Sequence, residues 1–150
     1  MSNEQILTGG CRCGAVRYQA REQAMDVAYC HCTDCRGFSG APVVVWIAYN
    51  TNQCEFTGEA PSSYESSPGI EWLFCNKCGT SIAWTAASLR FDDLHITEFL
   101  IGTLDDPQAA MPDRHWFAGE QLDWFEVSDD LPRYQQLDGD ADPVYHGPRA

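Results

Sequence analysis

Seven of the eight cysteines in this 150-residue chain fall into three short groups. The groups are Cys-Arg-Cys-Gly at 11–14, Cys-His-Cys-Thr-Asp-Cys at 30–35 and Cys-Asn-Lys-Cys-Gly at 75–79. Cysteines separated by two other residues in a turn can aim both sulfurs at one ion, and a following glycine supplies the positive φ that closes the turn. Cysteines flanking a single residue share a face of an extended chain. The pattern predicts metal binding, and zinc is the ion that prefers four tetrahedral sulfur ligands.

Two other uses of paired cysteines fit the sequence less well. Residues 1–10 lack the basic region and apolar stretch of a secretory signal, so we expect a cytoplasmic protein, in which disulfides are rare. A redox Cys-x-x-Cys is expected beside a β–α–β unit, and nothing around Cys32 or Cys75 has that pattern. Cys54 stands alone in an apparent strand and is predicted to be a small buried hydrophobic residue.

The charge of the chain excludes two classes of partner. The formal net charge is −13, and the nine basic residues form no run. Binding to phosphate groups needs a patch of Lys or Arg, so we expect no nucleic-acid partner and no anionic membrane surface. No apolar segment has the length of a membrane span.

Strand signals are frequent and short, which predicts a mostly β domain over residues 1–135. The clearest is a β-branched and aromatic run at 42–49, predicted to be a buried strand. Gly9-Gly10 is a predicted turn. Helix is expected only as one turn within 32–38 and a short piece within 126–137, where Pro132 limits it. Residues 136–150 are acidic, contain Gly and Pro, and are predicted to form a loose surface tail.

Seven candidate ligands divide naturally into four and three. Four thiolates close a structural zinc site, whereas three leave one position open for water or substrate. Spacing does not settle the pairing. The Cys-x-x-Cys pair at 32–35 could join that at 75–78 in one zinc ribbon. Alternatively, the pair at 11–13 could join that at 75–78, which leaves a local three-thiolate site of Cys30, Cys32 and Cys35.

Three cysteine motifs resemble those of a known family. Gly10 to Val16 (GCRCGAV), residues 30–36 (CHCTDCR) followed by 39–42 (SGAP), and 74–80 (FCNKCGT) are similar to the motifs of the glutathione-dependent formaldehyde-activating enzymes. Centromere protein V is a relative of that family. Weaker similarity at 102–107, and at 115–117 together with Trp124, extends the resemblance from about residue 8 to residue 134.

The resemblance implies a β-tent fold, in which small antiparallel sheets are held by zinc. It implies two zinc ions, one structural and one catalytic. The structural ligands correspond to Cys11, Cys13, Cys75 and Cys78, and the catalytic ligands to Cys30, Cys32 and Cys35. The implied activity is that of a carbon–sulfur lyase, with a small thiol such as glutathione as partner and formaldehyde or a related small aldehyde as the group transferred.

Other side chains near the cysteines have ordinary explanations. His31 lies between two candidate ligands and is expected to point away from them. Asp34 suits a turn cap and equally a group that hydrogen-bonds to a metal ligand. Arg36 could meet a substrate carboxylate, but an ion pair with one of the many acids is the expected use. Trp46 is expected in the core, because aromatic residues in an apolar strand usually pack there.

An alternative function is a non-catalytic, zinc-stabilised β module that binds a protein partner. A fourth protein ligand that completes the coordination of the second zinc would favour this alternative. A methionine sulfoxide reductase of the B type is disfavoured, because it needs a late nucleophilic cysteine and none follows Cys78. No pattern indicates an oligomeric state.

Overall fold

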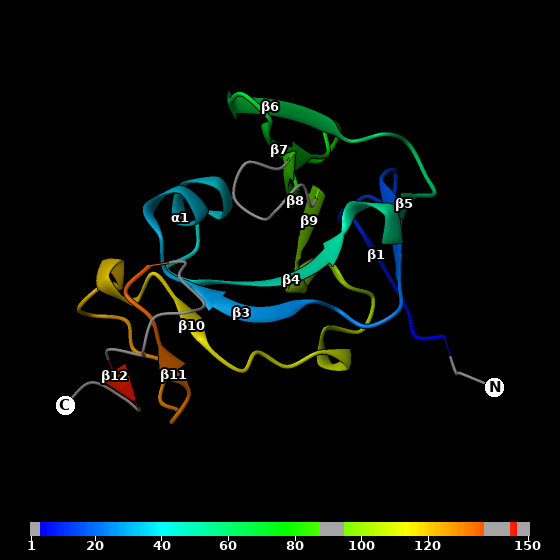
Figure 1. Ribbon diagram of the computed structural model, residues 1–150. Helices are drawn as coiled ribbons and strands as arrows, with labels where there is room; N and C mark the ends of the chain where they lie inside the picture. The colour runs from blue at the N-terminus through cyan, green and yellow to red at the C-terminus, as the bar shows by residue number, and fades with distance from the viewer. Residues whose placement is uncertain (1–3, 88–94, 137–144, 147–150) are drawn as a thin grey trace. The chain divides into compact units, whose positions relative to one another are not determined.

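The computed structural model describes residues 4–87, 95–136 and 145–146 of the chain. Within these ranges the chain has twelve strands and one α-helix, so the predicted mostly β class is confirmed (Figure 1). No helix of the described ranges is long and apolar enough to cross a membrane.

The chain folds into two compact units. The first consists of Met1–Asp26 and Ile47–Ala110, and the second of Val27–Trp46 and Met111–Ala150. The domain boundary at residue 135 stays a prediction. The predicted tail falls largely on 137–144 and 147–150, which lie outside the described residues.

The first unit contains a three-stranded antiparallel sheet of β1 (Ile6–Gly10), β2 (Arg17–Arg21) and β5 (Cys54–Phe56). Tyr18 of β2 is buried and stacks on Phe99 with ring centroids 3.9 Å apart. Its hydroxyl lies 2.6 Å from that of Thr103. The predicted turn at Gly9-Gly10 is wrong, because both glycines belong to β1. A Cβ on Gly9 would overlap the Tyr18 ring, so the glycine serves close packing.

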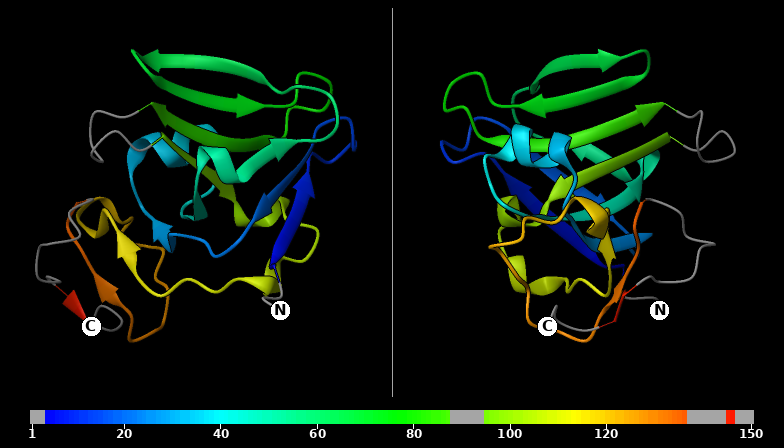
Figure 2. Two further views of the ribbon diagram at one scale, coloured as in Figure 1. Left: turned by 45° about the vertical axis from the view of Figure 1, so that its right-hand side comes forward. Right: turned by 90° about the vertical axis from the view of Figure 1, so that its left-hand side faces the viewer.

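The same unit contains a second run of hydrogen-bonded strands. Its order is β4 (Val44–Asn50, in this unit from Ile47), β9 (His95–Leu100), β8 (Ser81–Ala87), β7 (Ile70–Phe74) and β6 (Ser62–Ser67). The neighbours from β9 to β6 pair antiparallel, and the β6–β7 hairpin is visible in both views of Figure 2. The predicted buried strand at 42–49 corresponds to β4. Three 3-10 turns complete the unit: η1 (Thr51–Gln53), η2 (Ile101–Thr103) and η3 (Pro107–Ala109).

The second unit combines parallel and antiparallel pairing. β10 (His115–Trp116) pairs parallel with both β3 (Asp26–Cys30, in this unit from Val27) and β11 (Pro132–Arg133). β12 (Tyr145–His146) pairs antiparallel with β11, and the turn η4 (Ala118–Glu120) follows β10. The expected helical piece within 126–137 is wrong for residues 126–136, where the chain is irregular and then enters β11.

The helical turn predicted within 32–38 is confirmed as α1 (Thr33–Ser39). The helix begins at Cys32, whose sulfur accepts a hydrogen bond from the Cys35 N–H at 3.3 Å. It ends at Gly40, which has φ 73° and is left-handed, a conformation that glycine adopts without strain. The cap is therefore Cys32, and not Asp34 as the sequence suggested.

Candidate metal centres

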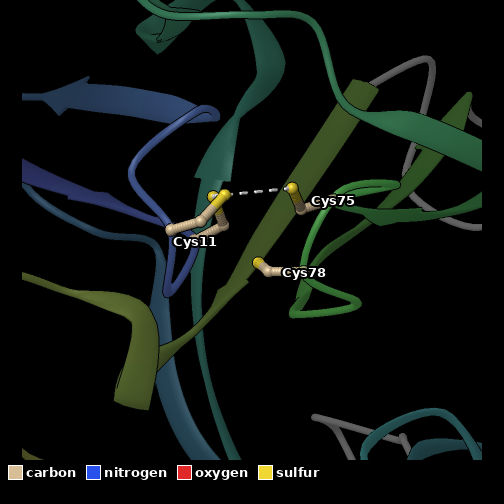
Figure 3. Close-up of side chains that lie close together, drawn as sticks. Cys11, Cys75 and Cys78 are labelled. Atoms are coloured by element: carbon tan, nitrogen blue, oxygen red, sulfur yellow. Dashed lines mark hydrogen bonds between the residues drawn. The ribbon is translucent and has the colours of Figure 1, made fainter.

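Four cysteines of the first unit gather at the ends of two strand pairs. Cys11 and Cys13 lie between β1 and β2, and Cys75 and Cys78 lie between β7 and β8. All four sulfurs are within 4.8 Å of one another. The Cys11 and Cys13 sulfurs are 3.5 Å apart, and those of Cys13 and Cys75 are 3.8 Å apart. Figure 3 shows Cys11 across from Cys75 and Cys78. We call this set the four-cysteine cluster.

Local turn chemistry brings each pair of sulfurs together. Gly14 and Gly79 have φ of 82° and 78°, as the sequence predicted. Their N–H groups donate to the carbonyls of Cys11 and Cys75 at 3.1 and 2.8 Å, which closes the two turns. The Val16 N–H donates to the Cys11 sulfur at 3.3 Å. These turns would be strained with any other residue in place of either glycine.

The spacing of these four sulfurs suits one tetrahedral ion. With Zn–S bonds of about 2.3 Å, ligand sulfurs stand about 3.8 Å apart. Hydrogen bonds from Thr80 lower the pKa of Cys78 to about 5. A hydrogen bond from the Ala15 backbone lowers the pKa of Cys13, but the neighbouring cysteines and burial outweigh it and raise that pKa to about 11. Four adjacent thiolates repel one another, so full ionisation needs a cation, and the cluster could hold a metal ion.

The second unit holds a three-cysteine cluster of Cys30, Cys32 and Cys35. Cys30 ends β3, Cys32 caps α1, and Cys35 lies in the first turn of that helix. The three sulfurs lie within 4.8 Å of one another, with those of Cys30 and Cys35 3.4 Å apart. Cys30 and Cys35 are buried, whereas Cys32 is partly exposed. The cluster is therefore accessible from the side of Cys32.

The electrostatics of this cluster allow one thiolate readily and more only with a cation. Hydrogen bonds from the Cys30 and Cys35 thiols lower the pKa of Cys32 to about 3, and backbone N–H groups add to this effect. The neighbouring thiols and burial raise the pKa of Cys30 far above its ordinary value. The hydrogen bond with Cys30 lowers the pKa of Cys35, but Cys32 and burial raise it overall to about 12. Three thiolates in this space could hold a metal ion.

Trp46 of β4 contacts the three-cysteine cluster directly. It is buried as predicted, and its indole Nε1–H donates to the Cys35 sulfur at 3.3 Å. Its ring lies nearly parallel to that of Phe38, with centroids 6.4 Å apart. Sequence reasoning placed Trp46 in the core but missed the sulfur contact, because an alternating strand pattern does not indicate which side chain from another segment faces it.

This contact makes Trp46 a reporter of the cluster. A free cysteine sulfur quenches a nearby indole, so we expect zinc added to metal-free protein to raise tryptophan emission when it binds the Cys35 sulfur that the Trp46 indole contacts. The Trp46→Phe variant should lose most of that rise while binding the same amount of zinc. Trp72→Phe is a matched control, since the Trp72 indole donates instead to the Ser66 hydroxyl at 3.0 Å. An equal rise in the Trp46→Phe variant would contradict the assignment.

The other candidate side chains have structural contacts. His31 points away from the sulfurs, as expected, and is fully buried. Arg36 was expected to pair with an acid, but its Nη1 donates to the backbone carbonyls of His31 and Glu120 at 2.5 and 2.6 Å. The Glu120 carboxylate accepts from the Thr33 hydroxyl at 2.9 Å. These contacts attach the start of α1 to η4.

Both clusters lie within the segment that matches a known family. The profile of the glutathione-dependent formaldehyde-activating enzyme family matches residues 6–120. The chain belongs to this family. The match covers all seven clustered cysteines, so the resemblance seen in the sequence is confirmed.

Two relatives place this family member in context. A Schizosaccharomyces pombe protein described as an uncharacterized lyase is 30% identical over 76 residues, which are 49% of this chain and 53% of that protein. This chain thus spans about half the length of that relative. The fold is also similar to the crystal structure of a Rhodobacter sphaeroides protein, with a TM-score of 0.52 and 20% sequence identity. The matched region covers 70% of this chain and 97% of that protein's chain. The second likeness concerns the fold alone.

Proposed function

We propose that this chain is a zinc-dependent carbon–sulfur lyase that acts on adducts of a small aldehyde with a small thiol. Formaldehyde and glutathione are the pair that the family description suggests. The lyase description of the Schizosaccharomyces pombe relative supports the reaction class. The observation that carries the proposal is the three-cysteine cluster, which offers one ligand fewer than a closed zinc site.

The two clusters fit two different uses of zinc. The four-cysteine cluster provides a complete tetrahedral set and would hold a structural ion, with Cys11, Cys13, Cys75 and Cys78 as ligands. In the three-cysteine cluster Cys30, Cys32 and Cys35 would hold a catalytic ion. All seven donors are sulfur, which favours zinc over hard cations such as Mg²⁺. The β-tent fold and a reducing, cytoplasmic location belong to the same proposal, because thiolate ligands must stay reduced.

The chemistry requires a stabilised thiolate. A zinc ion bound by three cysteines would supply an open position that favours the deprotonated form of a substrate thiol. In the lyase direction the carbon–sulfur bond of a hydroxymethyl thioether breaks and its electron pair stays on sulfur. The hydroxyl proton leaves as the carbon–oxygen double bond of the aldehyde forms, and the thiol is then reprotonated. The addition direction reverses these steps.

The chain's own residues prepare this site in two ways. The burial of Cys30 and Cys35 keeps water from two of the three ligands, while the partly exposed Cys32 lies on the side that a substrate can approach. The indole N–H of Trp46 and the N–H of Cys35 donate to sulfurs of the cluster, which fixes the positions of those sulfurs.

Metal analysis and an exchange assay test the proposal together. Protein purified without chelator should contain two zinc ions per chain. It should also accelerate exchange between ¹³C-formaldehyde and its glutathione adduct, followed by NMR, and chelator-treated protein should not. Refilling with zinc is the control for chelator damage. Two ions without acceleration for glutathione or other small thiols would overturn the lyase proposal and favour the non-catalytic zinc module.

A further inference from the structure

A line of hydrogen-bonded polar side chains runs through the second unit from His31, the residue between Cys30 and Cys32. His31 is fully buried, and its Nε2 lies 2.8 Å from Nδ1 of His115. His115 is also fully buried, and its Nε2 lies 3.0 Å from a carboxylate oxygen of Asp129. The other carboxylate oxygen is 3.0 Å from the buried guanidinium of Arg133. Three fully buried polar groups are thus connected through the partly exposed carboxylate of Asp129.

The chemistry of these groups determines which atom donates and which accepts in each hydrogen bond of the line. An ionised carboxylate only accepts hydrogen bonds, so His115 donates to Asp129 from Nε2. Burial lowers the pKa of His115, which favours the neutral ring. The Nδ1 of a neutral ring protonated at Nε2 accepts, so it receives the hydrogen bond of His31 Nε2. The orientation of the His31 ring is therefore fixed by Asp129 through His115.

The backbone of His31 is held as firmly as its ring. Its N–H donates to the Trp116 carbonyl at 3.1 Å, and its carbonyl accepts from Arg36 at 2.5 Å. On an extended segment the neighbours of a residue point to the opposite side. Cys30 and Cys32, which flank His31, accordingly direct their sulfurs into the cluster. A residue held at three points thus sets the directions of two candidate ligands.

We propose that His31, His115 and Asp129 are positioning residues for the metal site of the three-cysteine cluster. They hold the Cys30–Cys32 segment in its ligating geometry without touching the ion. The inference rests on the proposed function, because it needs a metal in that cluster. Well-packed apolar residues often stabilise a protein interior as much as a buried polar network does. A positioning role therefore explains the network of His31, His115 and Asp129 better than stabilisation does. Outer-shell partners of metal ligands have such effects elsewhere.

A Co²⁺ titration distinguishes a positioning role of these three residues from a contribution to the stability of the fold. Metal-free protein is titrated with Co²⁺ against a competing chelator, and thiolate-bound Co²⁺ is followed by visible absorption. His115→Leu keeps bulk but removes both hydrogen bonds. We expect it to weaken binding at one of two sites about 10- to 100-fold and to alter the spectrum of that ion. The four-cysteine cluster is the internal control and should bind Co²⁺ as in the wild type.

Further variants keep the inference falsifiable. His115→Gln retains a donor and an acceptor and should recover most of the lost affinity. If His115→Leu does not fold, Asp129→Asn replaces it, since Asp129 is partly exposed, and should weaken the same site. Val44→Ala, which removes buried methyl groups from the same unit, should lower the melting temperature without changing either affinity.

The outcomes distinguish this inference from the function on which it rests. If the wild type binds two Co²⁺ ions and the His115→Leu and Asp129→Asn variants bind both with unchanged affinity, the positioning role is wrong and the proposed function stands. If the wild type binds one ion, both proposals are overturned. A selective loss at the three-cysteine cluster with recovery in His115→Gln is the result we expect.

Discussion

Replacing Cys75 with serine should abolish the cooperative folding of the first unit. Cys75 is 1% exposed and lies within 4.8 Å of the other three sulfurs of the four-cysteine cluster. Structural zinc contributes about 10–16 kcal/mol to the folding of small domains. That is as much as the whole stability of a typical domain, about 5–15 kcal/mol. A serine hydroxyl is a poor zinc ligand, so most of this contribution should disappear.

Cys54 offers a matched control for this variant. It lies outside both clusters, and its thiol donates to the Asn50 carbonyl at 3.6 Å. Burial raises the pKa of Cys54 to about 12, so the thiol is neutral and serine removes no charge. Cys54→Ser should keep its metal and a cooperative thermal transition near that of the wild type. If the Cys75→Ser variant had the same melting temperature and the same zinc content as the Cys54→Ser variant, the four-cysteine cluster would have no structural ion.

The turns of the four-cysteine cluster could be predicted from local chemistry, but the pairing of its two halves could not. A glycine after Cys13 and another after Cys78 predict a positive φ at these two positions, and both glycines have a positive φ. The meeting of Cys13 with Cys75 joins residues 62 positions apart, and spacing left two pairings open. The resemblance to the family favoured the pairing that the structure shows. Long-range contact depends on strand order, which short alternating patterns do not encode.

Contacts that depend on packing were missed for a similar reason. Gly9 is a turn residue by composition, yet it lies in a strand because the Tyr18 ring passes close to it. His115 is 84 residues from His31, and a lone histidine gives no signal of a buried partner. Trp46 matched an apolar strand pattern that was correct about burial and silent about the Cys35 sulfur. The spacing of a single sequence indicates ligands more readily than the residues that hold them.

Replacing Cys32 should remove the proposed lyase activity and one zinc ion while leaving the chain folded. Cys32 is the least buried member of the three-cysteine cluster, so its loss leaves little empty space. Two remaining thiolates would not hold zinc tightly. We expect kcat/KM to fall by more than the factor of about 10–100 that loss of an outer-shell partner causes. Zinc content should fall from two ions to one, with the far-ultraviolet circular dichroism unchanged.

Serine and alanine at this position separate the two roles of Cys32, which caps α1 as well as belonging to the cluster. Its sulfur accepts the hydrogen bond of the Cys35 N–H, a task that a serine hydroxyl performs well. Cys32→Ala should therefore be about 1 kcal/mol less stable than Cys32→Ser. Both variants should be equally inactive, because neither supplies a thiolate. Full activity in Cys32→Ser would show that the chemistry does not need this sulfur, and the three-cysteine cluster would then have only a structural role.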